Sequence, residues 1–159
     1  RRQRQMCIRD RDFSTSVEVI LHAIDYYENK GEFYETVVLL QPTSPLRKGR
    51  HIREALDVYN DTVDMVVSVK KSSAASTICE ENMEGYLELI LNKRGGRRQE
   101  VNYYEYNGAI YVINVSSLKK YKTLCFPRVR KYVMDEYSSV DIDTLLDFWI
   151  VESILKNVK

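Results

Sequence analysis

The sequence predicts an α/β protein whose mixed, mostly parallel sheet is covered by helices on both faces. Two short apolar runs, at residues 36–41 (TVVLLQ) and 64–69 (DMVVSV), have the length and the β-branched content of strands buried on both faces. Each run follows a segment with helical spacing of its apolar residues, at 12–31 and 48–60. Helix, strand, helix and strand in this order predict right-handed crossovers between parallel strands.

Length and composition predict one ordinary globular domain. The chain has 159 residues, 44% of them hydrophobic, which is enough for a single core. Its net charge is +1, so there is no overall field of the kind that favours nucleic acid or a membrane surface as a partner. We place this single domain at residues 12–159.

The cysteines and the apolar segments predict the compartment. Cys7, Cys79 and Cys125 are odd in number, widely spaced and without a CxxC pair, which favours reduced thiols over disulfides or a zinc site. No apolar segment approaches the length of a membrane span, and no signal-peptide pattern is visible. We therefore expect a cytoplasmic protein.

Residues 1–11 (RRQRQMCIRDR) differ in character from the rest of the chain. They carry five arginines and no periodicity that could bury a face. Three interpretations stay open, namely a solvated arm, a basic tail that binds nucleic acid, and a segment that is not native to the protein. Nothing else in the sequence points to nucleic acid, so we expect no such partner.

The remaining elements can be placed by their patterns. In the segment 12–31, Ser14 or Ser16 is a candidate N-cap, and Gly31 is a candidate stop. Residues 109–114 (AIYVIN) predict a strand and residues 116–121 a helical turn. Residues 123–134 predict irregular chain with a strand-like portion, and residues 145–155 a helix.

The first predicted strand stops abruptly in a polar turn, QPTSPLR, at residues 41–47. Ligands of open α/β sheets bind at the carboxyl ends of the strands. Gln41, Thr43 and Ser44 follow the strand directly, so we expect them to face a ligand.

Two carboxylates precede the last predicted helix. Asp141 and Asp143 stand at positions i and i+2, and in an extended segment such side chains project to the same face. Oxygen ligands of this kind suit Mg²⁺, which usually keeps several waters and a substrate phosphate as its other ligands. The alternative is that Asp143 is the N-cap of the helix 145–155.

A basic loop follows residues 86–91, which could form a short strand. Its sequence, NKRGGRRQEV, places Gly95 and Gly96 among four basic residues. Unhindered backbone N–H groups and guanidinium groups can bind an oxyanion, although a solvated hairpin tip would have the same composition.

Four motifs together resemble the acylneuraminate cytidylyltransferases, enzymes that make CMP-activated nine-carbon sugar acids. They are LLQPTSPLR at 39–47, RRQ at 97–99, NGAIY at 107–111 and DIDT at 141–144, and they occur in the order of that family. The resemblance implies a Rossmann-like nucleotide-diphospho-sugar transferase fold. It also implies a reaction in which CTP and a nonulosonic acid give the CMP-sugar and pyrophosphate.

The same resemblance implies roles for individual residues. Asp141 and Asp143 would hold Mg²⁺, which shifts the choice for this pair from capping to metal binding. Arg98, preferred over Arg97, would bind the sugar carboxylate, because a guanidinium group can contact both oxygens at once. The other implied contacts are to the sugar acid from Gln41, Thr43, Ser44, Gln99, Asn107, Tyr111 and Phe126, and to the nucleotide from Ser14 and Thr15.

The family begins with a strand and an Arg/Lys-containing loop that holds the CTP triphosphate, and no match to them precedes Asp12. We therefore expect an amino-terminally truncated member, incomplete at that end of the sheet, with slow turnover or none. The segment 77–106 corresponds to a family excursion that suggests a homodimer. Two alternatives remain: a related nucleotidyltransferase that uses a Kdo-type acid, and a non-catalytic remnant that binds a sugar acid or a partner subunit.

Overall fold

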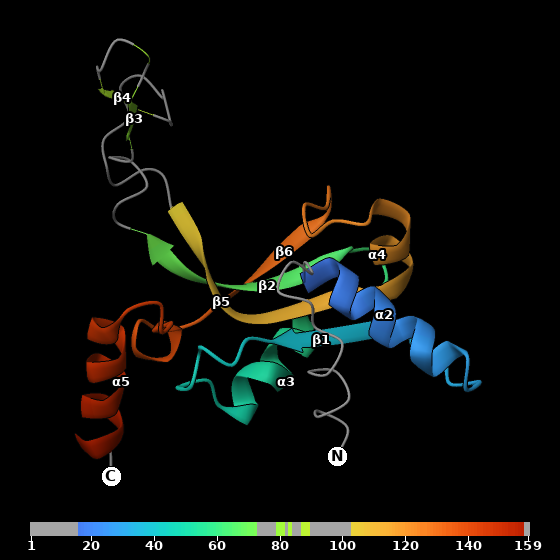
Figure 1. Cartoon of the computed structure of the whole chain (residues 1–159), viewed down its shortest axis with the longest axis horizontal. Helices are drawn as coiled ribbons and strands as arrows, with labels where there is room; N and C mark the ends of the chain where they lie inside the picture. Colours follow the sequence, from blue (N-terminus) through green and yellow to red (C-terminus); the bar gives the residue numbers. More distant parts are fainter. Residues whose placement is uncertain (1–15, 73–78, 82, 84–86, 90–102, 158–159) are drawn as a thin grey trace.

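In a computed structural model, the protein contains a four-stranded sheet and a separate two-stranded sheet (Figure 1). The structure describes residues 16–72, 79–81, 83, 87–89 and 103–157. The strands of the main sheet are β1 (Thr36–Leu40), β2 (Met65–Ser72), β5 (Tyr103–Asn114) and β6 (Val129–Val133). The helices are α2 (Ser16–Glu28), α3 (Gly49–Val58), α4 (Val115–Tyr121) and α5 (Leu145–Asn157), with a short 3-10 turn, η2 (Tyr137–Ser139).

The main sheet is mixed, as the sequence predicts. Its strand order is β1-β5-β2-β6, and β5 runs antiparallel to both of its neighbours, while β2 and β6 are parallel. The two strands expected from residues 36–41 and 64–69 therefore run in the same direction, but they are not adjacent. The long strand β5 lies between them, and the apolar run at 109–114 revealed only its second half.

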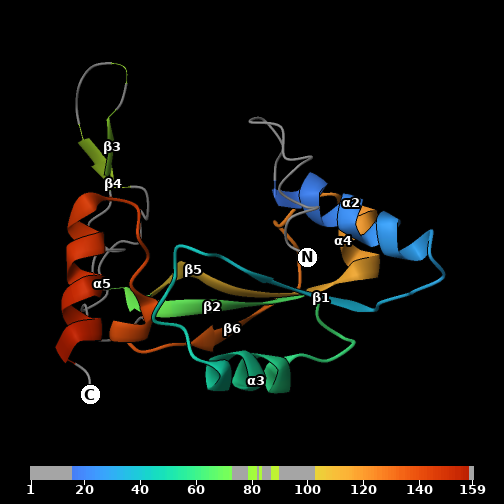
Figure 2. The ribbon, with the colours of Figure 1, turned by 60° about the horizontal axis from the view of Figure 1, so that its bottom comes forward.

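Helices cover both faces of the sheet (Figure 2). On one face, α2 and α4 pack against Met65, Val67 and Ile113. On the other face, α3 packs against Val66 and Val112. The alternation of these residues along β2 and β5 is the period-2 pattern of a pleated strand, so each strand supplies both cores.

The boundaries of α2 follow from local chemistry. Gly31 has a φ of 78°, the left-handed conformation that favours glycine. Its N–H donates to the carbonyl of Glu28 at 2.9 Å, and the N–H of Glu32 donates to the carbonyl of Tyr27 at 3.0 Å. These two bonds form a Schellman motif and confirm Gly31 as the stop of this helix.

Strand β5 carries a bulge in its middle. Tyr111 pairs with Val67 and Tyr106 pairs with Val69, so the segment 107–110 lies opposite Ser68 alone. Bulges of this kind redirect side chains and often lie next to functional sites. Here the bulge contains Asn107 and Gly108, which begin the NGAIY motif.

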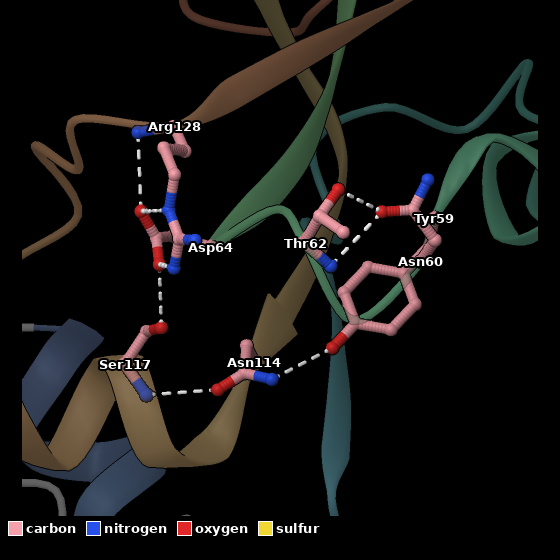
Figure 3. A network of polar contacts seen from close by, with 7 residues as sticks. All are labelled: Tyr59, Asn60, Thr62, Asp64, Asn114, Ser117 and Arg128. Carbon is pink, nitrogen blue, oxygen red and sulfur yellow. Dashed lines mark hydrogen bonds and ion pairs between the residues drawn. The ribbon is translucent and has the colours of Figure 1, made fainter.

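A buried ion pair closes the opposite end of β2 (Figure 3). Asp64 is fully buried, and its carboxylate accepts hydrogen bonds from Nη2 of Arg128 at 2.7 Å and from Oγ of Ser117 at 2.7 Å. Asn114, the N-cap of α4, accepts from the N–H of Ser117 and donates to the hydroxyl of Tyr59. This network joins β2, β5, α4 and the chain entering β6.

Helix α5 lies beside the end of the sheet rather than on either of its faces (Figures 1 and 2). Only Val151 of this helix is buried. Six large apolar side chains are between 41% and 64% exposed: Leu145, Leu146, Phe148, Trp149, Ile150 and Leu155.

The two-stranded sheet pairs β3 (Cys79–Glu81) with β4 (Leu87–Leu89). Strand β4 lies within residues 86–91, where the sequence suggested a short strand. No helix in the described ranges is long and apolar enough to cross a membrane.

Candidate functional site

Three segments that are far apart in the sequence meet beyond the carboxyl end of β1. They are the turn after β1, the bulge of β5 and the segment 140–143 before α5. The N–H of Ile142 donates to the carbonyl of Thr43 at 2.9 Å, and Oγ of Ser44 donates to Oδ1 of Asp141 at 3.2 Å. The turn after β1 therefore holds both the backbone and the carboxylate of the DID motif.

Gly108 forms the other side of this contact. Its φ is 72°, and a Cβ atom built on it would lie 2.9 Å from Oδ2 of Asp141 and 3.7 Å from Cγ. Real Cβ atoms essentially never approach so closely. Only glycine therefore lets the bulge of β5 and the carboxylate of Asp141 lie where they do.

Arg47 holds the turn after β1 through two hydrogen bonds to backbone carbonyl groups. Its Nη1 donates to the carbonyl of Gln41 at 2.9 Å and to the carbonyl of Ala109 at 2.7 Å. Burial lowers the pKa of this guanidinium, although it remains charged at any working pH. One side chain thus ties the end of β1 to the bulge of β5.

We expect Arg47→Lys to loosen this junction. A single ammonium group on a flexible stem cannot reproduce the fixed fork of donors that spans two carbonyl groups. The loss of one charged hydrogen bond predicts a decrease of about 2 kcal/mol in the free energy of unfolding, measured by urea denaturation. Arg53→Lys, on the exposed side of α3, is the matched control; an equal effect of the two changes would contradict this role of Arg47.

Asn107 lies under the site and is 4% exposed. Its Oδ1 accepts from Oγ of Ser68 at 2.6 Å and from the N–H of Ala109 at 3.2 Å. Its Nδ2 donates to Oγ of Ser139 at 2.9 Å and contacts the sulfur of Met134 at 3.4 Å. Its amide is thus bonded within the protein, whereas the resemblance implied a place on the pocket wall.

The start of α5 shows which residue caps this helix. Oδ2 of Asp147 accepts from the N–H of Thr144 at 2.7 Å and from its hydroxyl at 2.6 Å, while the N–H of Asp147 donates to Oγ1 of Thr144 at 3.3 Å. Thr144 and Asp147 therefore form a reciprocal capping box. The hydrogen bonds from Thr144 lower the pKa of the Asp147 carboxyl.

Asp143 is consequently not needed as the cap. Its backbone N–H donates to Asp147 at 3.3 Å, and its exposed carboxylate has no hydrogen-bond or ion-pair partner among the residues that the structure describes. The alternative of an N-cap at Asp143 is wrong, because the next residue takes that place.

Tyr111 lies near the carboxylate of Asp141. Burial raises the pKa of its hydroxyl, and the nearby charges of Tyr106 and Asp141 raise it further. Its ring also packs against the core under α2 and α4. Tyr111 thus stands between the core and the site.

The other predicted site residues are distributed as follows. Gln41 and Thr43 are half-buried in the turn. Ser44 is 1% exposed to solvent and contacts Asp141. Phe126 does not reach the site: it is 8% exposed in the core with Ile20, Ile24 and Leu118, near the opposite end of β2. Ser14, Thr15, Arg97, Arg98 and Gln99 lie outside the described residues.

Two positions at the site were missed by the sequence reasoning. Ser68 is a fully buried hydroxyl within a run of valines, and this polar interruption of the apolar pattern was its only signal. Arg47 had a stronger signal, since it is the last residue of the motif QPTSPLR. A surface role was the natural assumption for it, because arginine is rarely buried.

The donors at the site fit a magnesium ion that keeps most of its own ligands. No group of three or more His, Cys, Asp or Glu side chains within the described ranges could hold a metal by itself. Asp141 and Asp143 offer two carboxylates, one held in place and one free. Mg²⁺ typically binds through one or two carboxylates together with waters and substrate phosphates, so two carboxylates would be a sufficient set of protein ligands.

Comparisons with known proteins find relatives that match most of the chain. No protein-family model matches the chain. The N-acylneuraminate cytidylyltransferase of Streptococcus agalactiae serotype V is 38% identical over 144 residues, which cover 86% of this chain and 33% of the relative. The enzyme of the same name from Escherichia coli O18:K1:H7 is 34% identical over 148 residues, which cover 90% of this chain and 34% of the relative.

A shorter relative is the CMP-N,N'-diacetyllegionaminic acid synthase of Legionella pneumophila. It is 28% identical over an alignment of 164 positions, which covers 94% of this chain and 68% of that protein. The chain therefore spans about a third of the length of the first relatives and about two thirds of this one.

Two solved structures share the fold. A CMP:2-keto-3-deoxy-manno-octonic acid synthetase complexed with CTP aligns with a TM-score of 0.61 at 15% identity and covers 91% of this chain and 69% of that chain. The 4-diphosphocytidyl-2C-methyl-D-erythritol synthase of Anaerococcus prevotii gives a TM-score of 0.60 at 13% identity and covers 91% of this chain and 68% of that chain. Both likenesses support the predicted Rossmann-like α/β fold. Over most of its length, the chain is similar to N-acylneuraminate cytidylyltransferases.

Proposed function

We propose that this chain takes part in the transfer of CMP from CTP to a nonulosonic acid, with release of pyrophosphate. The observation that carries the proposal is the fixed position of Asp141, which Ser44 holds from one side and Gly108 borders on the other. Its neighbour Asp143 has a free carboxylate among the described residues. The names of the relatives, which include sialic and legionaminic acid enzymes, support the class of substrate.

In this proposal Asp141 and Asp143 would hold Mg²⁺. The metal would neutralise negative charge that develops on the phosphates as pyrophosphate leaves. The contribution of the chain is positioning, because little covalent chemistry falls to the protein in a nucleotidyl transfer. We assign Gln41 and Thr43, in the turn beside Asp141, to the orientation of the sugar acid.

Further parts of the proposal extend the expectations from the sequence. We assign Arg98 and Gln99 to the sugar acid, Ser14 and Thr15 to the nucleotide, and the segment 77–106 to a homodimer contact. Cytoplasmic location is proposed from the cysteine pattern; within the described residues, Cys125 is a free thiol. A Kdo-type acid is the second candidate substrate, since a CMP-Kdo synthetase shares the fold.

The proposal is tested by pyrophosphate release with CTP, Mg²⁺ and a panel of sialic, legionaminic and Kdo-type acids. Asp143→Asn is expected to lower the rate on the order of 100-fold, because the amide no longer carries the charge that binds the metal. Glu152→Gln, on the exposed side of α5, is the matched control and is expected to leave the rate unchanged.

A binding experiment tests the same metal site if turnover is too slow to measure. Mn²⁺, added with CTP, should broaden the NMR signals of residues near Asp141 in the unchanged chain and not in Asp143→Asn. Equal behaviour of the two proteins in both assays would overturn the metal assignment. Binding of a sugar acid without release of pyrophosphate would favour a non-catalytic protein.

A further inference from the structure

We propose that Ser68 is a positioning residue, whose hydroxyl sets the place of the Asp141 carboxylate through Asn107. Ser68 lies on β2, is fully buried, and belongs to none of the motifs that indicate the family. Its connection to Asp141 follows two routes, one through the bulge of β5 and one through Ser139. The link to metal binding rests on the proposed function, whereas the placement of Asp141 is tested separately.

The first step is the contact of Ser68 with the bulge. The N–H of Ile110 donates to Oγ of Ser68 at 2.8 Å, and this hydroxyl in turn donates to Oδ1 of Asn107 at 2.6 Å. The bulge takes the segment 107–110 out of regular pairing with β2. The side chain of Ser68 thus supplies the hydrogen bonds that regular pairing would provide to this stretch of buried backbone.

The second step is the orientation of the Asn107 amide. A backbone N–H, that of Ala109, faces one of its terminal atoms at 3.2 Å, so this atom must be the acceptor oxygen. The amide nitrogen therefore faces Ser139 and donates to its Oγ at 2.9 Å. The Ser68 hydroxyl reinforces this orientation, because it donates to the same oxygen.

The third step leads from Asn107 to Asp141. Ser139 stands two residues before Asp141 and is anchored by Asn107, while Ile142 directly after it is anchored by Thr43. On the other route, Gly108 directly follows Asn107 and borders Oδ2 of Asp141. Both the backbone before Asp141 and the surface against its carboxylate thus depend on the side chain of Asn107.

These steps explain why a serine interrupts the valines of β2. An apolar residue at position 68 would leave the N–H of Ile110 and one bond of Asn107 unsatisfied in a place without water access. Groups that hold metal ligands in place typically change metal affinity 10- to 100-fold when they are removed. The hydroxyl of Ser68 acts on Asp141 through Asn107, so it is a positioning group and not a ligand.

The test compares Ser68→Ala with Ser117→Ala in the full chain. Both changes remove a buried hydroxyl and its hydrogen bonds, but Ser117 bonds to Asp64 at the opposite end of β2. In the absence of metal, Ser68→Ala is expected to shift the amide NMR signals of Gly108 and Asp141, and Ser117→Ala to leave them in place. With CTP present, the Mn²⁺ concentration that broadens these signals by half is expected to rise about tenfold in Ser68→Ala alone.

Ser139→Ala removes the hydrogen bond between Asn107 and Ser139 while Ser68 stays unchanged. This variant should also shift the amide NMR signal of Asp141. It also serves if Ser68→Ala does not fold. The inference is overturned if the folded variants at positions 68 and 139 both leave the Gly108 and Asp141 signals unchanged, or if Ser117→Ala shifts them equally. Absence of Mn²⁺ broadening in the unchanged chain would count against the proposed metal site, while the metal-free signals still decide the role of Ser68.

Discussion

Gly108→Ala is expected to displace the Asp141 carboxylate and to lower the rate of the proposed CMP transfer on the order of 100-fold. Two physical effects act together at this position. The φ of 72° strains any residue with a side chain, and the new Cβ atom would lie 2.9 Å from Oδ2 of Asp141. The carboxylate belongs to a side chain that can rotate, so the clash is relieved by movement of Asp141 rather than by unfolding.

Gly31→Ala separates the two effects. Gly31 has a similar φ of 78°, but a Cβ atom there would meet nothing within 4 Å. Both variants should therefore lose about 1 kcal/mol of stability from backbone strain, measured by urea denaturation. Only Gly108→Ala should also lose CMP transfer and the Mn²⁺ effect on nearby NMR signals. An alanine at 108 that leaves both readouts unchanged would show that the position of Asp141 does not matter for the reaction.

Much of the fold could be predicted from local patterns. The apolar runs of β1 and β2 and the spacing in α2 and α3 each contain enough information to place an element, because a buried strand or an amphipathic helix has its own period. The end of α2 at Gly31 could also be predicted locally, because glycine favours the positive φ of a helix stop. The first half of β5 could not be predicted, since its sequence, YYEYNG, mixes exposed and buried residues around a bulge.

The strand order depends on contacts that no local pattern contains. Helix and strand alternation predicts parallel neighbours, and β1 and β2 do run in the same direction. The antiparallel β5 comes between them after an intervening stretch of about thirty residues, from 73 to 102. Its place depends on the match of its two apolar faces to both cores, which is a property of the assembled sheet.

The candidate site shows the same division between local and long-range information. Residue types predicted Ser44 and Asp141 separately, and the structure joins them by a hydrogen bond across 97 positions of the sequence. The role of Asn107 could not be predicted from its type, because an asparagine in a motif suits a ligand contact as well as a buried network. Its 4% exposure and its bonds to Ser68 and Ser139 decide in favour of the network.

The largest loss of stability is expected for Asp64→Asn, at about 3 kcal/mol. The carboxylate of Asp64 accepts from the backbone N–H, Nε and Nη2 of Arg128 and from the hydroxyl of Ser117 (Figure 3). An asparagine would present an NH₂ group to some of these donors, so at least one buried bond becomes a repulsive contact. The side chain of Arg128 is 59% exposed and can be hydrated again when the pair is broken. The expected loss of stability therefore lies at the lower end of the range for a broken buried ion pair.

The pH dependence identifies the charge as the cause. The hydrogen bonds and charge of Arg128 lower the pKa of the Asp64 carboxyl from 3.8 to about 2. Because the folded protein binds this proton less readily than the unfolded chain, the stabilisation is complete above pH 3.8 and is lost as the pH falls toward 2. The difference in the free energy of unfolding between the natural chain and Asp64→Asn should therefore be constant at neutral pH and shrink between about pH 4 and pH 2.

Urea denaturation at several pH values measures this difference. Glu152→Gln is the matched control, because it removes a carboxylate from an exposed ion pair with Lys156. Such pairs contribute about 0.5 kcal/mol or less, and the loss should be reduced by salt. A difference for Asp64→Asn that stays constant down to pH 2 would show that packing, and not the ion pair with Arg128, accounts for the loss. Because Asp64 and Asp141 lie at opposite ends of the sheet, the stability effect should also leave the Gly108 and Asp141 NMR signals in place.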